Sequence, residues 1–308
     1  MPPATIGVDL GGTKVLAATV NGDGDVGARV KRPTSTDGPE AVAAAIAEMV
    51  RELGGAERIG VGTPGFVDSD GVVGGVPNMV GWDPPVALRT LLREATGIPH
   101  IVVDNDVNAG ALGEAAHGAA VGYPDALCVF MGTGVGAGLL LDGRLRRGPR
   151  GLAGEIGHLV VRAGGRRCGC GGRGHVEAYA GRAGMEGEAR RRHAAGEPTA
   201  LIDIAGDDRM KSSVFAKALD RDDPMAHELL GEAVEAVGAA IATAVMLVDV
   251  SVVVIGGGVA DKLGPHLVAR VGAAAAGLLG GGLAVPVVPA ALGDDAGVVG
   301  AALLARGA

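Results

Sequence analysis

The sequence predicts an α/β protein, because apolar runs that end in glycine-rich turns alternate with amphipathic helical segments along all 308 residues. Two segments share one strand–turn–strand plan: residues 5–20 turn at "DLGGTK", and residues 126–143 turn at "GTG". Their separation of about 120 residues indicates two related domains rather than one sheet. The length is also sufficient for two domains.

The other elements follow from periodicity and turn residues. Apolar spacing predicts amphipathic helices over residues 38–53 and 85–97, the second capped by Gly97. In chain order, the remaining predictions are a strand, loop and hairpin at 58–73, a strand entering a helix at 100–118, helices at 212–249 interrupted near Pro224, a strand at 250–261 that delivers three glycines, and a helix at 296–307.

Composition narrows the class of protein. Aromatic residues make up only 2% of the chain, so the core must consist of Val, Leu, Ile and Ala. The net charge of −8, without a long basic run, argues against a nucleic-acid-binding surface. Three cysteines do not suggest a disulfide scaffold, and "AAIATAVMLVDVSVVVI" contains Asp249, which predicts a helix followed by a strand rather than a membrane span. With no leader peptide evident, we expect a cytoplasmic protein without nucleic-acid or membrane partners.

Three glycine turns are candidates for phosphate or nucleotide binding. In the first, Gly11 and Gly12 leave backbone N–H groups available to phosphate oxygens, Thr13 adds a hydroxyl donor, and Asp9 is suited to hydrated Mg²⁺. A plain hairpin turn is the alternative, because neither a Walker A nor a G-x-G-x-x-G pattern is present. The second turn repeats the plan, and the third would let an adenine or ribose approach closely; these turns are Gly132, Thr133 and Gly134, and Gly256, Gly257 and Gly258.

Two polar residues stand where the strand at 100–105 meets the following helix. Asp106 could accept the proton of a substrate hydroxyl as a general base, and Asn105 could hydrogen-bond a neighbouring hydroxyl. A helix-capping role for Asp106 or Asn108 is the alternative.

A glycine-rich stretch, residues 154–181, holds the potential ligands of a metal ion. His158, Cys168, Cys170 and His175 supply two imidazoles and two thiols, the donors that tetrahedral Zn²⁺ prefers. The spacing H-x9-C-x-C-x4-H is not that of a zinc finger, and two free cysteines in a loop are the alternative. We expect a structural Zn²⁺ that orders the loop and presents Glu155 and Glu177 to sugar hydroxyls.

The motifs "DLGGTK", "GTPG", "PN", "DNDVNA", "MGTGVGAG", "GEIGH" and "CGCGGRGHVEAYAG", in this order, resemble those of the ROK family of bacterial sugar kinases and repressors. The resemblance covers essentially the whole chain. It implies a two-domain fold of the actin, hexokinase and Hsp70 class, which is ribonuclease H-like, with an interdomain cleft. The implied domains are residues 1–107 plus about 294–308, and a larger domain, 108–293, that carries the zinc loop.

The resemblance also implies residue roles. Asp106 matches the catalytic base, and His158 matches a residue that contacts both sugar and zinc. Where the family usually has a third zinc-ligand cysteine, this chain has His175. The implied sugar ligands are Gly65, Asn78, Asn105, Asp106, Glu155, His158 and Glu177, and the implied ATP and phosphate ligands are Asp9, Gly11, Gly12, Thr13, Lys14, Gly132, Thr133, Gly134, Gly256, Gly257 and Gly258.

The activity implied is ATP-dependent phosphorylation of glucose at the 6-hydroxyl, with Mg²⁺ and structural Zn²⁺, by a homodimer or homotetramer. Kinases for N-acetylglucosamine, N-acetylmannosamine, fructose or allose are the alternatives. A sugar-sensing repressor is disfavoured, because the first predicted strand begins near Thr5 and leaves no room for a helix-turn-helix before it.

Overall fold

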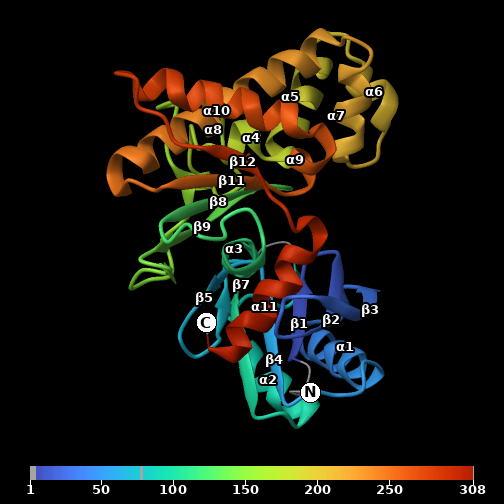
Figure 1. Cartoon of the computed structure of the whole chain (residues 1–308). Helices are drawn as coiled ribbons and strands as arrows, with labels where there is room; N and C mark the ends of the chain where they lie inside the picture. The colour runs from blue at the N-terminus through green and yellow to red at the C-terminus, as the bar shows by residue number, and fades with distance from the viewer. Residues whose placement is uncertain (1–4, 77–78, 308) are drawn as a thin grey trace. The chain divides into compact units, whose positions relative to one another are not determined.

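Two five-stranded sheets organise the chain in the computed structural model, which describes residues 5–76 and 79–307. The strand orders are β3-β2-β1-β4-β7 and β10-β9-β8-β11-β12 (Figure 1). The chain divides into two compact units: the first comprises Met1–Pro124, Gly138–Gly154 and Ala291–Ala308, and the second Asp125–Ala137 and Glu155–Ala290. The predicted α/β class is confirmed.

The first sheet is built around β1 (Thr5–Leu10). This strand pairs antiparallel with β2 (Lys14–Val20) and parallel with β4 (Arg58–Thr63). At the two edges lie β3 (Val26–Pro33), antiparallel to β2, and β7 (His100–Asn105), parallel to β4.

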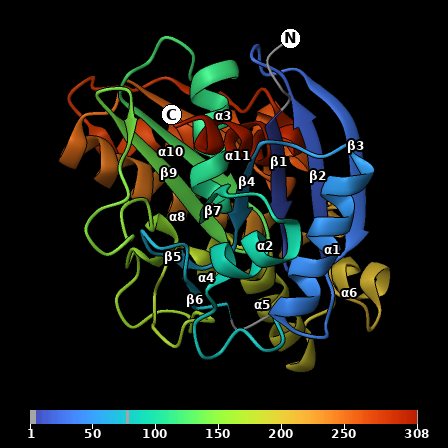
Figure 2. The same ribbon diagram turned by 90° about the horizontal axis from the view of Figure 1, so that it is seen from below.

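The two faces of this sheet are covered differently because side chains alternate along each strand. Ile6, Val8 and Leu10 join one core with α1 (Pro39–Glu52) and α2 (Leu88–Thr96). On the opposite face, a Cβ at Gly7 would lie 1.9 Å from the carbonyl oxygen of Val298, so α11 (Ala296–Arg306) packs directly on the backbone of β1. Helix α11 also packs on the backbone of β4, because a Cβ at Gly60 would lie 1.6 Å from the carbonyl oxygen of Ala301. Helices α1, α2 and α11 are labelled in Figure 2.

Helix α3 (Asp106–His117) belongs with α11 in the first unit. A Cβ at Gly300 would lie 1.6 Å from the carbonyl oxygen of Ala109, so the two helices touch backbone to backbone. The first unit therefore extends beyond the expected boundary at residue 107 and also takes in residues 138–154.

A buried carboxylate secures the chain where it enters α11. Glu114 is fully buried and accepts hydrogen bonds from the backbone N–H groups of Ala119, Ala291 and Leu292. A buried charge requires such partners, and the bonds join the end of α3 to the segment before α11.

The second sheet contains three parallel strands: β8 (Ala126–Met131), β11 (Val252–Gly256) and β12 (Val287–Pro289). Next to β8 lies β9 (Val135–Leu141), and β10 (Arg144–Leu145) pairs antiparallel with β9 at the edge of the sheet. Every residue of β11 is buried, as expected for a strand inside a parallel sheet. The second unit contains the helices α4 (Glu177–Ala180), α5 (Arg182–Ala194), α6 (Ala200–Ala205), α7 (Ser212–Leu219), α8 (Pro224–Val248), α9 (Gly258–Leu263) and α10 (Pro265–Leu279).

Helix α8 is long and apolar enough to cross a membrane by length and composition. However, one side of it, which includes Leu229, Ala233, Val237 and Ile241, is buried in the second unit. The helix ends at Val248 and β11 begins at Val252, which confirms the predicted helix followed by a strand.

Most predicted elements are confirmed within a few residues. The left-handed cap at Gly97 and the break before Pro224 are both present. Strands β3, β10 and β12 and helices α4, α5, α6, α9 and α10 were not predicted, and the strand expected over 250–261 ends at Gly256, where Gly257 leads into α9. The sequence does contain signals for α10: Pro265 at its start and the helical spacing of Leu267, Val268 and Val271 both indicate a helix.

Candidate functional site

The first glycine turn joins β1 to β2. Gly11 N–H donates to the carbonyl of Lys14 at 2.9 Å, and the Thr34 hydroxyl donates to the carbonyl of Gly11 at 2.6 Å. Gly12, Thr13 and Lys14 are exposed, and a Cβ at Gly12 would meet no atom within 4 Å. The turn is thus a supported hairpin whose tip is open to a ligand.

Asp9 lies at the base of this turn. Burial raises the pKa of Asp9, the Lys14 ammonium opposes the shift, and the Asp294 carboxylate adds to it. Sequence reasoning missed Asp294, which precedes α11 and comes close to Asp9 only through the packing of that helix. Two carboxylates beside an exposed turn fit a divalent cation.

Asn105 and Asp106 lie where β7 meets α3, as predicted. Asn105 is the helix cap: its Oδ1 accepts from the N–H groups of Val107 and Asn108 at 2.9 and 3.2 Å. Its Nδ2 donates to the carbonyl of Gly65 at 3.1 Å, which brings two predicted sugar ligands together. The proposed capping role therefore falls to Asn105 rather than to Asp106 or Asn108.

Asp106 occupies the first turn of α3 and is half-buried. One of its oxygens, Oδ1, accepts from the N–H of Val107 at 2.9 Å. A carboxylate at this position is a suitable acceptor for the proton of a substrate hydroxyl.

Asp104 supports this corner and was not predicted. Its buried carboxylate accepts from Asn105 N–H at 2.7 Å and Asn108 Nδ2 at 3.0 Å, and pairs with Arg147 at 2.6 Å. The only sequence signal was a second aspartate within "DND".

The second and third glycine turns lie close together in the second unit. Gly132 N–H donates to the carbonyl of Gly134 at 2.9 Å, and the third turn approaches from the end of β11. A Cβ at Gly257 would lie 2.7–2.9 Å from backbone atoms of Met131, immediately before the second turn. Arg182 was missed: it donates to the Thr133 hydroxyl at 2.7 Å and holds the turn against α5.

Glu177 connects the second turn to the predicted metal ligands. Its Oε2 accepts from Val135 N–H at 3.1 Å, and its Oε1 accepts from the Cys168 thiol at 3.6 Å. Glu155 lies nearby: burial raises its pKa, His158 opposes the shift, and the Glu177 carboxylate adds to it. The distance between His158 Nε2 and Glu155 Oε2 is 3.7 Å. The three predicted sugar ligands of the second unit thus form one group.

His158, Cys168, Cys170 and His175 converge as predicted. One ligand atom from each residue lies within 4.8 Å of all the others. Cys170 Sγ is 3.2 Å from His175 Nδ1, and burial raises the pKa of Cys168 to about 12. A bound cation would favour the thiolate, which is the form of cysteine that binds metal.

Two further observations test whether the residues fit a metal. Nδ1 of His158 is buried without a hydrogen-bond partner in the described part of the chain, which suits a ring nitrogen that faces a metal. His175 has the space that it requires, because a Cβ at Gly172 would lie 2.3 Å from its ring. The donor set of two thiols and two imidazoles matches tetrahedral Zn²⁺.

The predicted residues therefore form two groups, one in each unit. Asn78 lies outside the described residues. The other predicted ligands lie in strands, in turns or near helix starts; the first unit holds Asp9, Gly11, Gly12, Thr13, Lys14, Gly65, Asn105 and Asp106, and the second holds Gly132, Thr133, Gly134, Glu155, His158, Cys168, Cys170, His175, Glu177, Gly256, Gly257 and Gly258.

Comparison with known proteins gives a consistent result. A model of the ROK family matches residues 5–308. A glucokinase from Streptomyces coelicolor is 36% identical over 98% of this chain and 97% of its own length, and an N-acetylmannosamine kinase from Escherichia coli O9:H4 is 32% identical over 98% of each. A ROK family glucokinase from Streptomyces griseus, solved in complex with glucose and AMPPNP, is 33% identical with a TM-score of 0.85 over 99% of this chain and 100% of that one.

Proposed function

Because the chain belongs to the ROK family and has the actin/hexokinase-like α/β fold, we propose that it is an ATP-dependent kinase that phosphorylates the 6-hydroxyl of glucose. The observation that carries the proposal is the pair Asn105 and Asp106 at the start of α3, in a chain similar over its full length to a glucokinase solved with glucose and an ATP analogue.

In the first unit, Asp106 accepts the proton of the 6-hydroxyl while that oxygen attacks the γ-phosphorus of ATP. The bond from the γ-phosphorus to the β–γ bridging oxygen breaks, and ADP leaves. Asn105 orients the sugar through the part of its amide that the cap and Gly65 leave accessible.

The glycine turns bind the nucleotide through backbone N–H groups. Thr13 and Lys14 in the first turn, and Thr133 in the second, add side-chain donors to phosphate oxygens. Mg²⁺, when bound near Asp9 and Asp294, would neutralise phosphate charge. The third turn, Gly256–Gly258, accepts the adenosine.

In the second unit, Glu155, His158 and Glu177 accept or donate hydrogen bonds to sugar hydroxyls. Zn²⁺, when held by His158, Cys168, Cys170 and His175, would order the glycine-rich loop and fix the His158 ring. We expect about one zinc per chain by elemental analysis, and a loss of zinc affinity in His175→Ala at least as large as the roughly 10–100-fold that loss of an outer-shell partner costs. If the native protein bound zinc no more tightly than a Cys168→Ser/Cys170→Ser variant, the proposed zinc site would be wrong.

The decisive experiment is ADP release by the purified protein with Mg-ATP across a panel of free sugars that includes glucose, fructose, allose and the two N-acetylhexosamines. Glucose is expected to give the highest kcat/KM. Turnover on N-acetylmannosamine in its place would favour the second candidate, which the E. coli relative supports. An absence of turnover on every sugar would refute the proposed activity.

The setting follows from the chemistry. The cytoplasm is the proposed location, because thiols stay reduced there. We retain the expectation of a homodimer or homotetramer, which sedimentation would test.

A further inference from the structure

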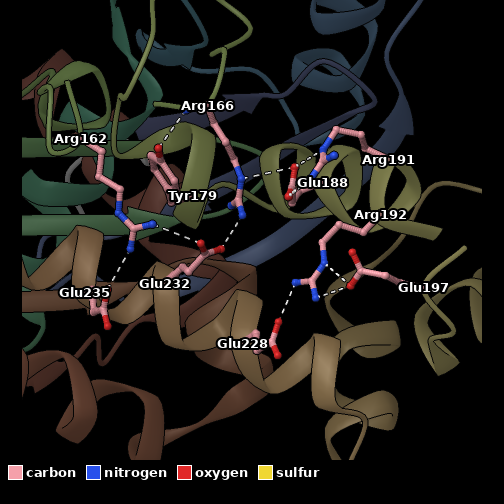
Figure 3. Close-up of polar contacts among 10 residues, drawn as sticks. All are labelled: Arg162, Arg166, Tyr179, Glu188, Arg191, Arg192, Glu197, Glu228, Glu232 and Glu235. Atoms are coloured by element: carbon pink, nitrogen blue, oxygen red, sulfur yellow. Dashed lines mark hydrogen bonds and ion pairs between the residues drawn. The ribbon is translucent and has the colours of Figure 1, made fainter. Parts of the chain in front are cut away.

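Arginine and glutamate side chains form a group of ion pairs near Tyr179, and two of these arginines belong to the segment that also carries Cys168 and Cys170 (Figure 3). This segment, residues 161–176, contains six glycines among sixteen residues, so it has little intrinsic order. Arg162 and Arg166 extend from it toward carboxylates of α5 and α8, and both contact Tyr179 of α4.

Tyr179 is the centre of the contacts. Its ring is buried, and the guanidinium carbons of Arg162 and Arg166 each lie 4.8 Å from the ring centroid. Its hydroxyl oxygen accepts from the backbone N–H of Arg166 at 2.9 Å. The ring therefore attracts two cations while its hydroxyl binds the loop backbone.

The ion pairs of Arg166 are less exposed to solvent than those of Arg162. Only 17% of its side chain is exposed, compared with 41% for Arg162. It pairs with Glu232 of α8 at 2.5 Å and with Glu188 of α5 at 3.5 Å. The hydrogen bond from Arg191 is the main reason that the pKa of Glu188 is lowered; burial opposes the shift, and Arg166 adds to it. Partly buried pairs of this kind are screened less than surface pairs.

The position of Arg166 in the chain gives these contacts their importance. It lies two residues before Cys168, and its carbonyl accepts from Gly174 N–H at 2.8 Å, next to His175. Tyr179 lies two residues after Glu177 in the same short helix. The Arg166 side chain and the Tyr179 ring thus connect the predicted metal ligands and the proposed sugar ligand Glu177 to helices α5 and α8.

We propose that Arg166 and Tyr179 form a positioning clamp that holds the segment 161–176 and Glu177 in their binding geometry independently of the metal. The sugar-binding part of this inference rests on the proposed function. Ordering a glycine-rich loop costs conformational entropy, and a loop ordered in advance binds metal and sugar more tightly. In this chain His175 replaces the cysteine that the family usually has in the metal site, and the clamp orders the segment independently of that site.

The test compares Arg166→Met with native protein by hydrogen exchange and metal release. We expect peptides within 161–176 to exchange at least about tenfold faster, before and after chelation of the metal, since the clamp acts without it. Zinc release to a chromogenic chelator should be faster by a similar factor. A cobalt-loaded sample should show altered thiolate-to-metal absorption, because the geometry of the ligands has changed.

The kinetic signature distinguishes positioning from general stability. Arg166→Met should raise the sugar KM about tenfold and change kcat by less than about threefold, because Asp106 lies in the other unit. Arg166→Lys should recover part of the loss, since it keeps the charge and the contact with the ring but not the planar fork.

Arg191→Met is the matched control. Arg191 bonds the same Glu188 but is 66% exposed and lies outside the segment, so exchange, zinc release and KM should stay at native values. Tyr179→Phe, which keeps the ring and removes the acceptor of Arg166 N–H, provides a second test if Arg166→Met does not fold. Exchange and zinc release in Arg166→Met and Tyr179→Phe equal to those of Arg191→Met would overturn the clamp. Hydrogen exchange and metal release test the clamp even if the native protein phosphorylates no sugar. In that case only the proposed function fails.

Discussion

The turn after β1 and the turn after β8 follow one plan in different surroundings. Each ends a central strand of a five-stranded sheet, at Gly11–Lys14 in the first unit and at Gly132–Gly134 in the second. The first turn is open at its tip and has the carboxylates of Asp9 and Asp294 at its base. The second is bonded to Arg182, and the residue after it to Glu177.

This difference suggests separate roles for the two units in the proposed mechanism. In the proposed mechanism, the first unit contributes the carboxylates of Asp9 and Asp294 and the base Asp106, all of which would act in the chemical step. The second unit joins its turn, through the carboxylate of Glu177, to the predicted metal ligand Cys168, and in the proposed mechanism these groups would bind the sugar. Substitutions in the first unit should therefore lower kcat, and those in the second should raise KM.

The largest effect is expected for Asp106→Asn. Loss of the general base should lower kcat by about 10²–10⁴-fold and leave the sugar Kd nearly unchanged, because the amide keeps the shape of the carboxylate. Steady-state kinetics and calorimetric titration with glucose measure the two quantities. Near-native kcat in this variant would remove Asp106 from the catalytic role.

Glu177→Gln tests the second unit. A hydrogen bond to a charged acceptor contributes about 1.5–3 kcal/mol, so the sugar KM should rise roughly 10–100-fold with a smaller change in kcat. Glu186→Gln, which alters a carboxylate of α5 that pairs with Arg190, is the control and should behave as native. An equal fall in kcat and kcat/KM in Glu177→Gln would place Glu177 in the chemical step instead.

Arg182→Met should produce a smaller change. The variant loses the bond to the Thr133 hydroxyl and loosens the second turn, so the KM for ATP should rise about 2–10-fold while the KM for sugar stays constant. Arg190→Met, on the same helix but away from the turn, serves as the comparison. A shift in the sugar KM alone would assign the second turn to the sugar.

The smallest effect concerns stability at the first turn. Because burial raises the pKa of Asp9, its ionised form is disfavoured in the folded protein. The resulting cost is present above the folded pKa and disappears below the unfolded value, near 3.8. Asp9→Asn should therefore raise the Tm of the ligand-free protein at pH 7, by roughly 2–4 °C for each kcal/mol recovered, and the gain should shrink as the pH falls toward 4. Calorimetry across this range, with exposed Asp23→Asn as the control, would contradict the assignment if the gain were independent of pH.

Local sequence signals account for what was predicted well. Periodicity and caps located α1, α2 and α11, and the repeated apolar-run-and-glycine plan located the central strand and glycine turn of both sheets. The four predicted metal ligands lie within a stretch of 18 residues, so a folded loop is sufficient to bring them together. Asp294, Arg147, Arg182 and Tyr179 were missed because their partners lie 28 or more residues away or on other elements, where spacing carries no information.

The sequence by itself thus determined the α/β class, the order of the main strands and helices, and the chemical identity of the candidate ligands, because each depends on local periodicity, turn residues and side-chain type. Only the tertiary structure decided that Asn105 caps α3, that Asp294 lies beside Asp9, and that Glu177 is shared by the second turn and the metal loop. These relations arise when helices pack against sheets and bring distant carboxylates and N–H groups together, where burial changes their pKa values and hydrogen bonding.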